Sequence, residues 1–239
     1  MTQETDLDKP LPLIFMIFLP VYTGGLLAVA IFPLAGDWRW LEGWIFCISI
    51  GVILTIGFAY INKVNPRVLR NRMKTKKEGL TAITRRSAGS DRWIMPVMSI
   101  GFFTALMLPA WAHRQGWANL SFPVEMLGVL VMNIGVVILM VAMLQNAFAS
   151  KILDINQDQQ LVDTGLYSKV RHPLYAGAVL MILGVPIALG YWPGLVPAVI
   201  SVLSLVVRIK YEEEMLVKGM AGYAEYRERV KYRLIPRIY

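Results

Sequence analysis

The chain alternates long apolar runs with short polar stretches. Four runs, at residues 12–33, 41–61, 93–112 and 124–148, each have close to the ~20 residues that a helix needs to cross ~30 Å of hydrocarbon. A lone strand would leave its backbone groups unpaired in lipid, so helices are the expected spanning form. The pattern therefore predicts four transmembrane helices in the first part of the chain.

Two further apolar runs, at 174–190 and 194–210, are shorter and contain Pro186 and Pro197. The turn Gly190-Tyr191-Trp192-Pro193-Gly194 divides them. They form either two full helices or a tilted, kinked hairpin that dips from one face. The expected fold is an all-α polytopic membrane bundle of five to six spans, with a C-terminal helical hairpin and a polar tail.

Composition supports a membrane protein. Of the 239 residues, 56% are hydrophobic and only 17% are charged, whereas soluble domains are about a quarter charged. The mean hydropathy is +0.52. A chain of this length and character is expected to form a single membrane domain over 1–239.

The net charge of +8 is concentrated in a few segments. Residues 62–92 carry ten Lys or Arg, and the segment from 208 onward carries eight. The short connections on the opposite side carry only Arg39 and Arg114. By the positive-inside tendency, the loop 62–92, the segment 149–172 and the tail are expected on the cytoplasmic side. Basic residues are not interleaved with aromatic ones on a polar surface, which argues against nucleic-acid binding.

Tryptophans mark the expected opposite interface. Trp38, Trp40 and Trp44 follow the first run, and Trp111 and Trp117 lie near the other external turn. Aromatic belts of this kind form where helices leave the hydrocarbon.

Metal ligands are few. Cys47 is the only cysteine, and the two histidines, His113 and His172, lie far apart in the sequence. No intrachain disulfide is possible and no metal site is expected.

Candidate chemistry begins at Arg171-His172-Pro173. A residue before proline is pushed out of the helical region, while proline suits the first helical turn, so a helix is predicted to begin at Pro173. Its free backbone N–H groups favour an anion, and Arg171 and His172 add donors beside them. Tyr175 falls in the first turn.

The same helix carries a stripe of mostly small residues. Ala176, Gly177, Leu180 and Gly184 recur at spacings of three, four and seven residues. Small residues let membrane helices approach closely, which is the simplest interpretation. A flat ligand lying against this surface is the alternative.

The hairpin ends in a segment of charged residues. Arg208 and Glu212 are four residues apart and could pair on one helix face, while Glu213 points about a quarter-turn away. An antiparallel hairpin returns these acids to the membrane face that holds Arg171 and His172. Ionisable groups that face a cavity near the membrane are functional candidates. A site with both signs of charge suits a zwitterionic ligand.

The C-terminal part resembles isoprenylcysteine carboxyl methyltransferases and, more loosely, phospholipid N-methyltransferases. The resemblance is specific over about 150–236, where the order and spacing of several blocks agree. The matching residues are Leu161-Val162-Asp163-Thr164-Gly165-Leu166-Tyr167, Val170-Arg171-His172-Pro173-Leu174-Tyr175-Ala176-Gly177, Arg208, Glu212-Glu213, Leu216, Gly222-Tyr223, Tyr226 and Arg233-Leu234-Ile235-Pro236. Leu166 departs from the pattern, since many relatives have proline there; we expect this to alter the turn and not the chemistry.

The resemblance implies S-adenosylmethionine as methyl donor, bound by residues 149–239, with four helices in 1–148. The residues that it implies in the cofactor pocket are Tyr167, Arg171, His172, Tyr175, Gly177 and Glu212 or Glu213. A carboxylate acceptor needs only a cation such as Arg208 or Arg171 to hold it, so these two are candidate catalytic residues. An amine acceptor needs a base, and Glu213 is the candidate.

A lipidic or amphipathic acceptor would enter from the bilayer and the cofactor from the cytosol, so the site is expected on the cytoplasmic face of the membrane. Two other functions stay open. Sterol reductases look distantly similar in the same region, which suggests a membrane reductase that uses NADPH. A transporter or assembly protein is the non-catalytic alternative, although the repeated halves typical of transporters are not evident.

Overall fold

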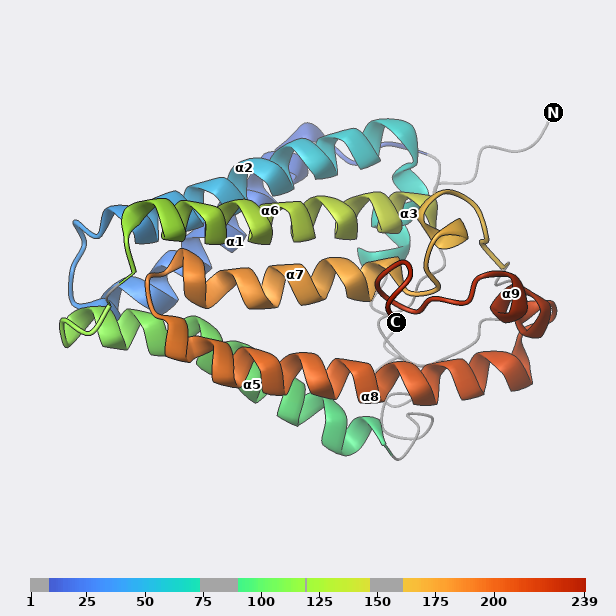
Figure 1. The fold of residues 1–239 in the computed structure, drawn as a ribbon. Coiled ribbons are helices and arrows are strands. Elements are labelled where there is room, and N and C mark those ends of the chain that lie inside the picture. Colours follow the sequence, from blue (N-terminus) through green and yellow to red (C-terminus); the bar gives the residue numbers. More distant parts are fainter. Residues whose placement is uncertain (1–8, 74–89, 119, 147–160) are drawn as a thin grey trace.

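The computed structural model describes residues 9–73, 90–118, 120–146 and 161–239 (Figure 1). Within these residues the chain is helical and contains no strand. The elements, in chain order, are α1 (Leu13–Ala35), α2 (Leu41–Val64), α3 (Pro66–Met73), α5 (Asp91–Arg114), α6 (Phe122–Gln145), the 3₁₀ turn η1 (Gly165–Ser168), α7 (Pro173–Ala188), the 3₁₀ turn η2 (Trp192–Gly194), α8 (Leu195–Gly219) and α9 (Tyr223–Arg229). The expected basic loop 62–92 lies partly outside the described residues.

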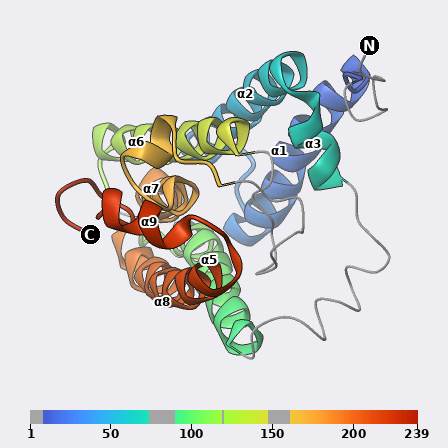
Figure 2. The same cartoon turned by 90° about the vertical axis from the view of Figure 1, so that its right-hand side faces the viewer.

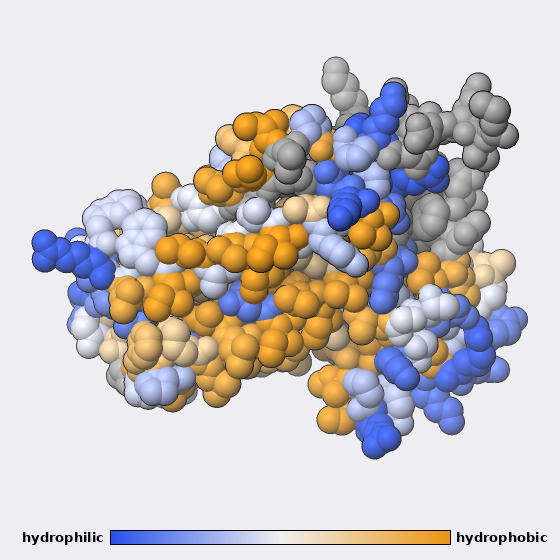
Figure 3. Space-filling view, turned by 90° about the horizontal axis from the view of Figure 1, so that it is seen from above, coloured by the Kyte–Doolittle hydropathy of each residue, from blue (hydrophilic) through white to orange (hydrophobic). Residues whose placement is uncertain are grey.

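Four of these helices, α2, α5, α6 and α8, are long and apolar enough to cross a membrane, and α1 and α7 add shorter apolar stretches. Large apolar side chains remain exposed on their outer faces, such as Ile56 of α2, Ile100 of α5 and Leu203 of α8. Figure 3 shows apolar surface along the middle of the molecule and polar surface towards its ends. The prediction of an all-α membrane protein is confirmed, and whether α1 and α7 also cross stays a prediction.

The two arms of the C-terminal hairpin differ more than the sequence suggested. The second apolar run, 194–210, lies in the 25-residue helix α8. The helix continues beyond the run because the charged segment after Arg208 is also helical, and hydropathy detects only the apolar part. The first arm, α7, has 16 residues. Pro197 lies in the first turn of α8, where proline is tolerated.

Helix α7 lies at the centre of the bundle, between α6 on one side and α8 on the other (Figures 1 and 2). Its most extensive contact is with α6, and the most extensive contact of α8 is with α5. Each arm of the hairpin therefore packs mainly against an earlier helix. The contacts with α6 and α5 therefore set the distance between α7 and α8. The start of α5 also lies close to Arg208 of α8.

Glycines permit these close approaches. A Cβ at Gly177 of α7 would lie 2.6 Å from the carbonyl oxygen of Gly135 in α6, and one at Gly101 of α5 would lie 2.8 Å from that of Pro197. Ser201 adds a hydrogen bond across the second contact, from its hydroxyl to the Met98 carbonyl at 2.8 Å. The backbones meet so closely that any side chain would force the helices apart.

The far end of the bundle is closed by aromatic rings. The His113 ring stacks on Trp40, with centroids 4.5 Å apart, and its Nε2 lies 3.2 Å from Asp37 Oδ2. Trp38 and Trp44 are exposed, but Trp40 is buried. Trp40 is therefore a core residue of this end, which corrects its assignment to an interfacial belt.

Candidate active site

The approach to α7 is held by the C-terminal segment of the chain. The helix begins at Pro173, as predicted, and His172 before it lies outside the helical region (φ −125°, ψ 62°). The backbone N–H groups of Arg171 and His172 donate to the carbonyl oxygens of Tyr232 and Arg233, both at 2.9 Å. Arg171 and His172 are consequently fixed between α7 and residues 230–233, and both are buried.

The turn η1 explains the departure at Leu166. Gly165 has φ +61°, which favours glycine, and the N–H of Leu166 donates to Gln145 Oε1 at the end of α6 at 2.9 Å. A proline at 166 has no N–H and could not make this bond. The side chain of Gln145 therefore anchors the turn to the end of α6.

One cluster of side chains centres on Glu213 of α8. Glu213 Oε1 accepts from Arg171 Nε at 2.6 Å and lies 3.2 Å from His172 Nε2. Glu213 Oε2 accepts from Arg233 Nε at 2.8 Å. The side chain is 3% exposed, so both carboxylate oxygens are engaged inside the protein. We call Glu213, Arg171, His172 and Arg233 the Glu213 cluster.

A second cluster centres on Arg208, one helical turn earlier on α8. Arg208 Nε lies 3.3 Å from Asp91 Oδ1 at the start of α5, and Nη1 lies 3.9 Å from Glu212 Oε2. Arg208 Nη1 also donates to the Tyr175 hydroxyl, which in turn donates to Glu212. The guanidinium group lies 5.8 Å from the centre of the Tyr175 ring. Arg208, Asp91, Tyr175 and Glu212 form the Arg208 cluster.

The two clusters are adjacent because α7 contributes to both. The rings of His172 and Tyr175 stack with centroids 5.5 Å apart and planes 26° from parallel. Consecutive glutamates of α8 then diverge: Glu213 is buried, Glu212 is 24% exposed and Glu214 is exposed. Within the acidic triplet, Glu212 therefore belongs to the Arg208 cluster, Glu213 to the Glu213 cluster, and Glu214 faces solvent.

The clusters carry opposite net charge. In the Glu213 cluster one carboxylate faces two guanidinium groups, which leaves an excess positive charge even with His172 neutral. In the Arg208 cluster one guanidinium faces two carboxylates, which leaves an excess negative charge. A ligand with an anionic group at one end and a cationic group near it fits this polarity. S-adenosylmethionine, with its carboxylate, ammonium and sulfonium groups, is such a ligand.

Two predicted site residues lie outside both clusters. Tyr167 is buried, and its carbonyl oxygen accepts a hydrogen bond from the Tyr226 hydroxyl at 2.7 Å, so it supports α9. Gly177 faces Gly135 of α6, which favours the helix-packing interpretation of the small-residue stripe. Cofactor contacts of these two residues stay predictions.

Sequence reasoning missed Asp91 as a site residue. It lies 117 positions from Arg208 in the sequence. It also lies in the expected basic loop, where the sequence suggests only that it offsets part of the positive charge. Its one signal is its place at the start of a helix, where acids are favourable. Arg233 is part of the family resemblance, and its hydrogen bond to Glu213 makes it a member of the Glu213 cluster.

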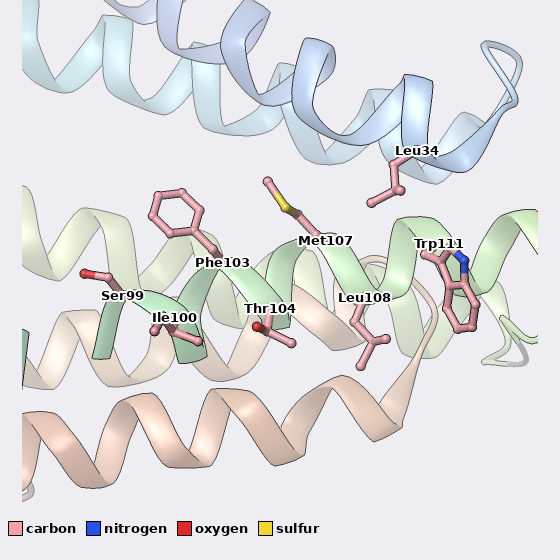
Figure 4. A pocket seen from close by; sticks show the side chains of 8 residues that line it. All are labelled: Leu34, Ser99, Ile100, Phe103, Thr104, Met107, Leu108 and Trp111. Atoms are coloured by element: carbon pink, nitrogen blue, oxygen red, sulfur yellow. The ribbon is translucent and has the colours of Figure 1, made fainter. Parts of the chain in front are cut away.

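A separate apolar groove of about 500 Å³ opens between α1 and α5, and Figure 4 shows its lining, from Ser99 to Trp111 of α5 and Leu34 of α1. The charged clusters contribute no residue to this lining. Its walls are mainly apolar side chains of α5.

Residues 124–221 are similar to a known family: the sequence model of the phospholipid methyltransferase family matches them. This region contains α6, α7 and α8 and thus most of both clusters, and the resemblance to membrane methyltransferases is confirmed. The other members of the clusters, Asp91 and Arg233, lie outside the match.

A solved structure has a similar fold: the eukaryotic intramembrane Ras methyltransferase ICMT (isoprenylcysteine carboxyl methyltransferase), determined without a monobody. The likeness covers 94% of this chain and 77% of that one, with a TM-score of 0.53 and 19% sequence identity. At this identity the likeness concerns the fold. A sequence comparison with curated proteins found no match.

Proposed function

We propose that this membrane methyltransferase uses S-adenosylmethionine to methylate the polar head of a lipidic or amphipathic acceptor. The observation that carries the proposal is the meeting of Arg171 and His172 from the start of α7 with Glu213 from the end of α8. His172 and Arg171 lie 41 and 42 positions before Glu213 in the sequence. Together the three residues form a buried site of mixed charge beside the N-terminus of α7.

The polarity of the site orients the cofactor. Arg171, Arg233 and the N-terminus of α7, where the excess charge is positive, would hold its carboxylate. Glu212, on the negative side, would face its ammonium and sulfonium groups. Tyr175 joins the two halves through its ring and its hydroxyl.

When bound, S-adenosylmethionine supplies a methyl group on a good leaving group, and the protein has to align it with the acceptor and exclude water. The buried guanidinium group of Arg171 would fix the position of the amino-acid part. Burial of Arg171, His172, Arg208 and Glu213 keeps water away from these charges.

The surroundings of Arg208 favour an amine acceptor over a carboxylate. Asp91 and Glu212 already balance Arg208, so an acceptor carboxylate would have to displace one of them. An amine would instead meet an excess of negative charge. It also needs a base, and Glu212, with its partly exposed carboxylate, suits that role better than Glu213, whose two oxygens are engaged.

The location follows from the same proposal. Both clusters lie at the end of the bundle that carries α3, α9 and the basic segments, which we assign to the cytoplasmic face. An acceptor reaches this end laterally from the bilayer, and the soluble cofactor reaches it from the cytosol.

The test is ligand binding to the purified protein in lipid nanodiscs, followed by turnover. Calorimetry is expected to give saturable binding of S-adenosylhomocysteine and none of NADPH. With radiolabelled S-adenosylmethionine, transfer to an amine-bearing phospholipid should exceed transfer to an isoprenylcysteine. Binding of NADPH without S-adenosylhomocysteine would instead support a reductase, and faster labelling of the isoprenylcysteine would support carboxyl methylation.

A further inference from the structure

Tyr223, the first residue of α9, is buried with an unsatisfied hydroxyl. Its side chain is 3% exposed, and its oxygen has no hydrogen-bond partner within the described residues. A buried hydroxyl that lacks a partner is destabilising. A native structure that keeps one invites an explanation, and a hydrogen bond to a ligand would supply it.

Tyr226, one turn later on the same helix, provides the internal comparison. It is also buried, at 1% exposure, and its hydroxyl donates to the Tyr167 carbonyl at 2.7 Å. The two rings contact each other, with centroids 5.6 Å apart. Tyr226 thus fulfils a packing role with a satisfied hydroxyl, so packing on α9 does not by itself require the open hydroxyl of Tyr223.

Helix α9 is tied to the Glu213 cluster, because Arg171 Nη1 donates to the carbonyl oxygen of Val230 at the end of α9 at 2.6 Å. The charged groups that act on Tyr223 are Glu213 and Arg171 of this cluster and, more weakly, Glu212. Burial raises the pKa of Tyr223, and the negative charge of Glu213 raises the pKa further, while Arg171 lowers it. The hydroxyl therefore keeps its proton at neutral pH and is a donor. A donor beside the positively charged half of the site is suited to an anionic acceptor.

We propose that the Tyr223 hydroxyl donates a hydrogen bond to the carboxylate of the amino-acid part of the bound cofactor. The inference rests on the proposed function, since it assumes that S-adenosylmethionine binds between the two clusters. It makes Tyr223 a cofactor-binding residue that selects for the amino-acid part and not for the nucleoside.

The experiment compares Tyr223→Phe with Tyr226→Phe in nanodiscs, using S-adenosylhomocysteine and 5′-methylthioadenosine, which lacks the amino-acid part. Tyr223→Phe should raise the Kd for S-adenosylhomocysteine about tenfold, as expected when a hydrogen bond to a charged group is lost, and leave the Kd for methylthioadenosine unchanged. Its Tm should be equal to or above that of the wild type. Tyr226→Phe should lower the Tm and leave both Kd values unchanged.

Three results decide against the inference in distinguishable ways. An unchanged Kd for S-adenosylhomocysteine in Tyr223→Phe overturns the inference alone. Equal weakening of both ligands assigns Tyr223 a structural role and also overturns it. If the wild type binds neither ligand, the proposed function and the inference fall together.

A second measurement avoids dependence on a folded variant. With 3-fluorotyrosine incorporated at position 223, the ¹⁹F resonance should shift on addition of S-adenosylhomocysteine and stay in place with methylthioadenosine. A resonance that responds to neither ligand, in protein that binds S-adenosylhomocysteine, contradicts the inference.

Discussion

The Glu213 cluster and the Arg208 cluster stand one helical turn apart on α8 and differ in how far their carboxylates are committed. Glu213 is 3% exposed, and its two oxygens meet Arg171, His172 and Arg233. Glu212 is 24% exposed and is bonded to Tyr175. One glutamate joins three segments of the fold, and its neighbour keeps a partly exposed carboxylate. Under the proposed function, the two adjacent glutamates divide a structural and a reactive role.

The most severe loss is expected from Glu213→Gln. Removing one partner of a buried ion pair leaves the others charged and unpaired, which costs about 3–5 kcal/mol. Thermal unfolding in detergent should show a clearly lower Tm and weakened binding of S-adenosylhomocysteine. Glu214→Gln, at the exposed third position of the triplet, is the matched control and should behave like the wild type. A Glu213→Gln protein with the wild-type Tm would contradict the structural role of Glu213.

Glu212→Gln should have the opposite profile. Because the side chain is partly exposed, the unfolding free energy should change by no more than about 1 kcal/mol. Turnover of an amine acceptor should fall about 10²-fold or more with the loss of the base, while turnover of a carboxylate acceptor, which needs no base, should not fall by that factor. Steady-state kinetics with both acceptors measures this, and an equal loss for both would assign Glu212 to cofactor binding only.

Asp91→Asn tests the balance of charge around Arg208. Removing one of the two carboxylates lowers the negative charge around Arg208, so relative turnover should move from amine towards carboxylate acceptors by about tenfold, or ~1.4 kcal/mol. Asp37→Asn, which affects the His113 contact at the far end, is the control. Unaltered acceptor preference in Asp91→Asn would show that Asp91 only positions α5.

The smallest effect is expected outside both clusters, at the turn η1. Leu166→Pro removes the N–H that Gln145 accepts and should lower the unfolding free energy by about 1 kcal/mol. Gln145→Ala should cost a similar amount. In a double-mutant cycle the two losses should not add, because they remove the same bond. Additive losses would mean that Leu166 and Gln145 act independently.

Much of the helical frame could be predicted from the sequence. Runs of apolar residues gave α2, α5 and α6 to within a few residues, and the proline rule placed the start of α7 at Pro173. The spacing of four between Arg208 and Glu212 also predicted their contact. These features depend on local periodicity, which the sequence displays directly.

Tertiary contacts could not be predicted in this way. No local pattern tells that α7 packs mainly on α6, or that Asp91 reaches Arg208 from another helix. Arg233 meets Glu213 because the chain turns back after α8, and hydropathy carries no information on that turn. The glycines of the small-residue stripe pack on α6, and no local pattern identified that partner helix.

The most direct test of the central claim is the structure of the protein in lipid with S-adenosylhomocysteine bound. The account predicts the amino-acid part between the two clusters, with its carboxylate at Arg171 and Tyr223 and its sulfur towards Glu212. A ligand bound at the aromatic end near Trp40, or one that leaves both clusters without contact, would contradict it.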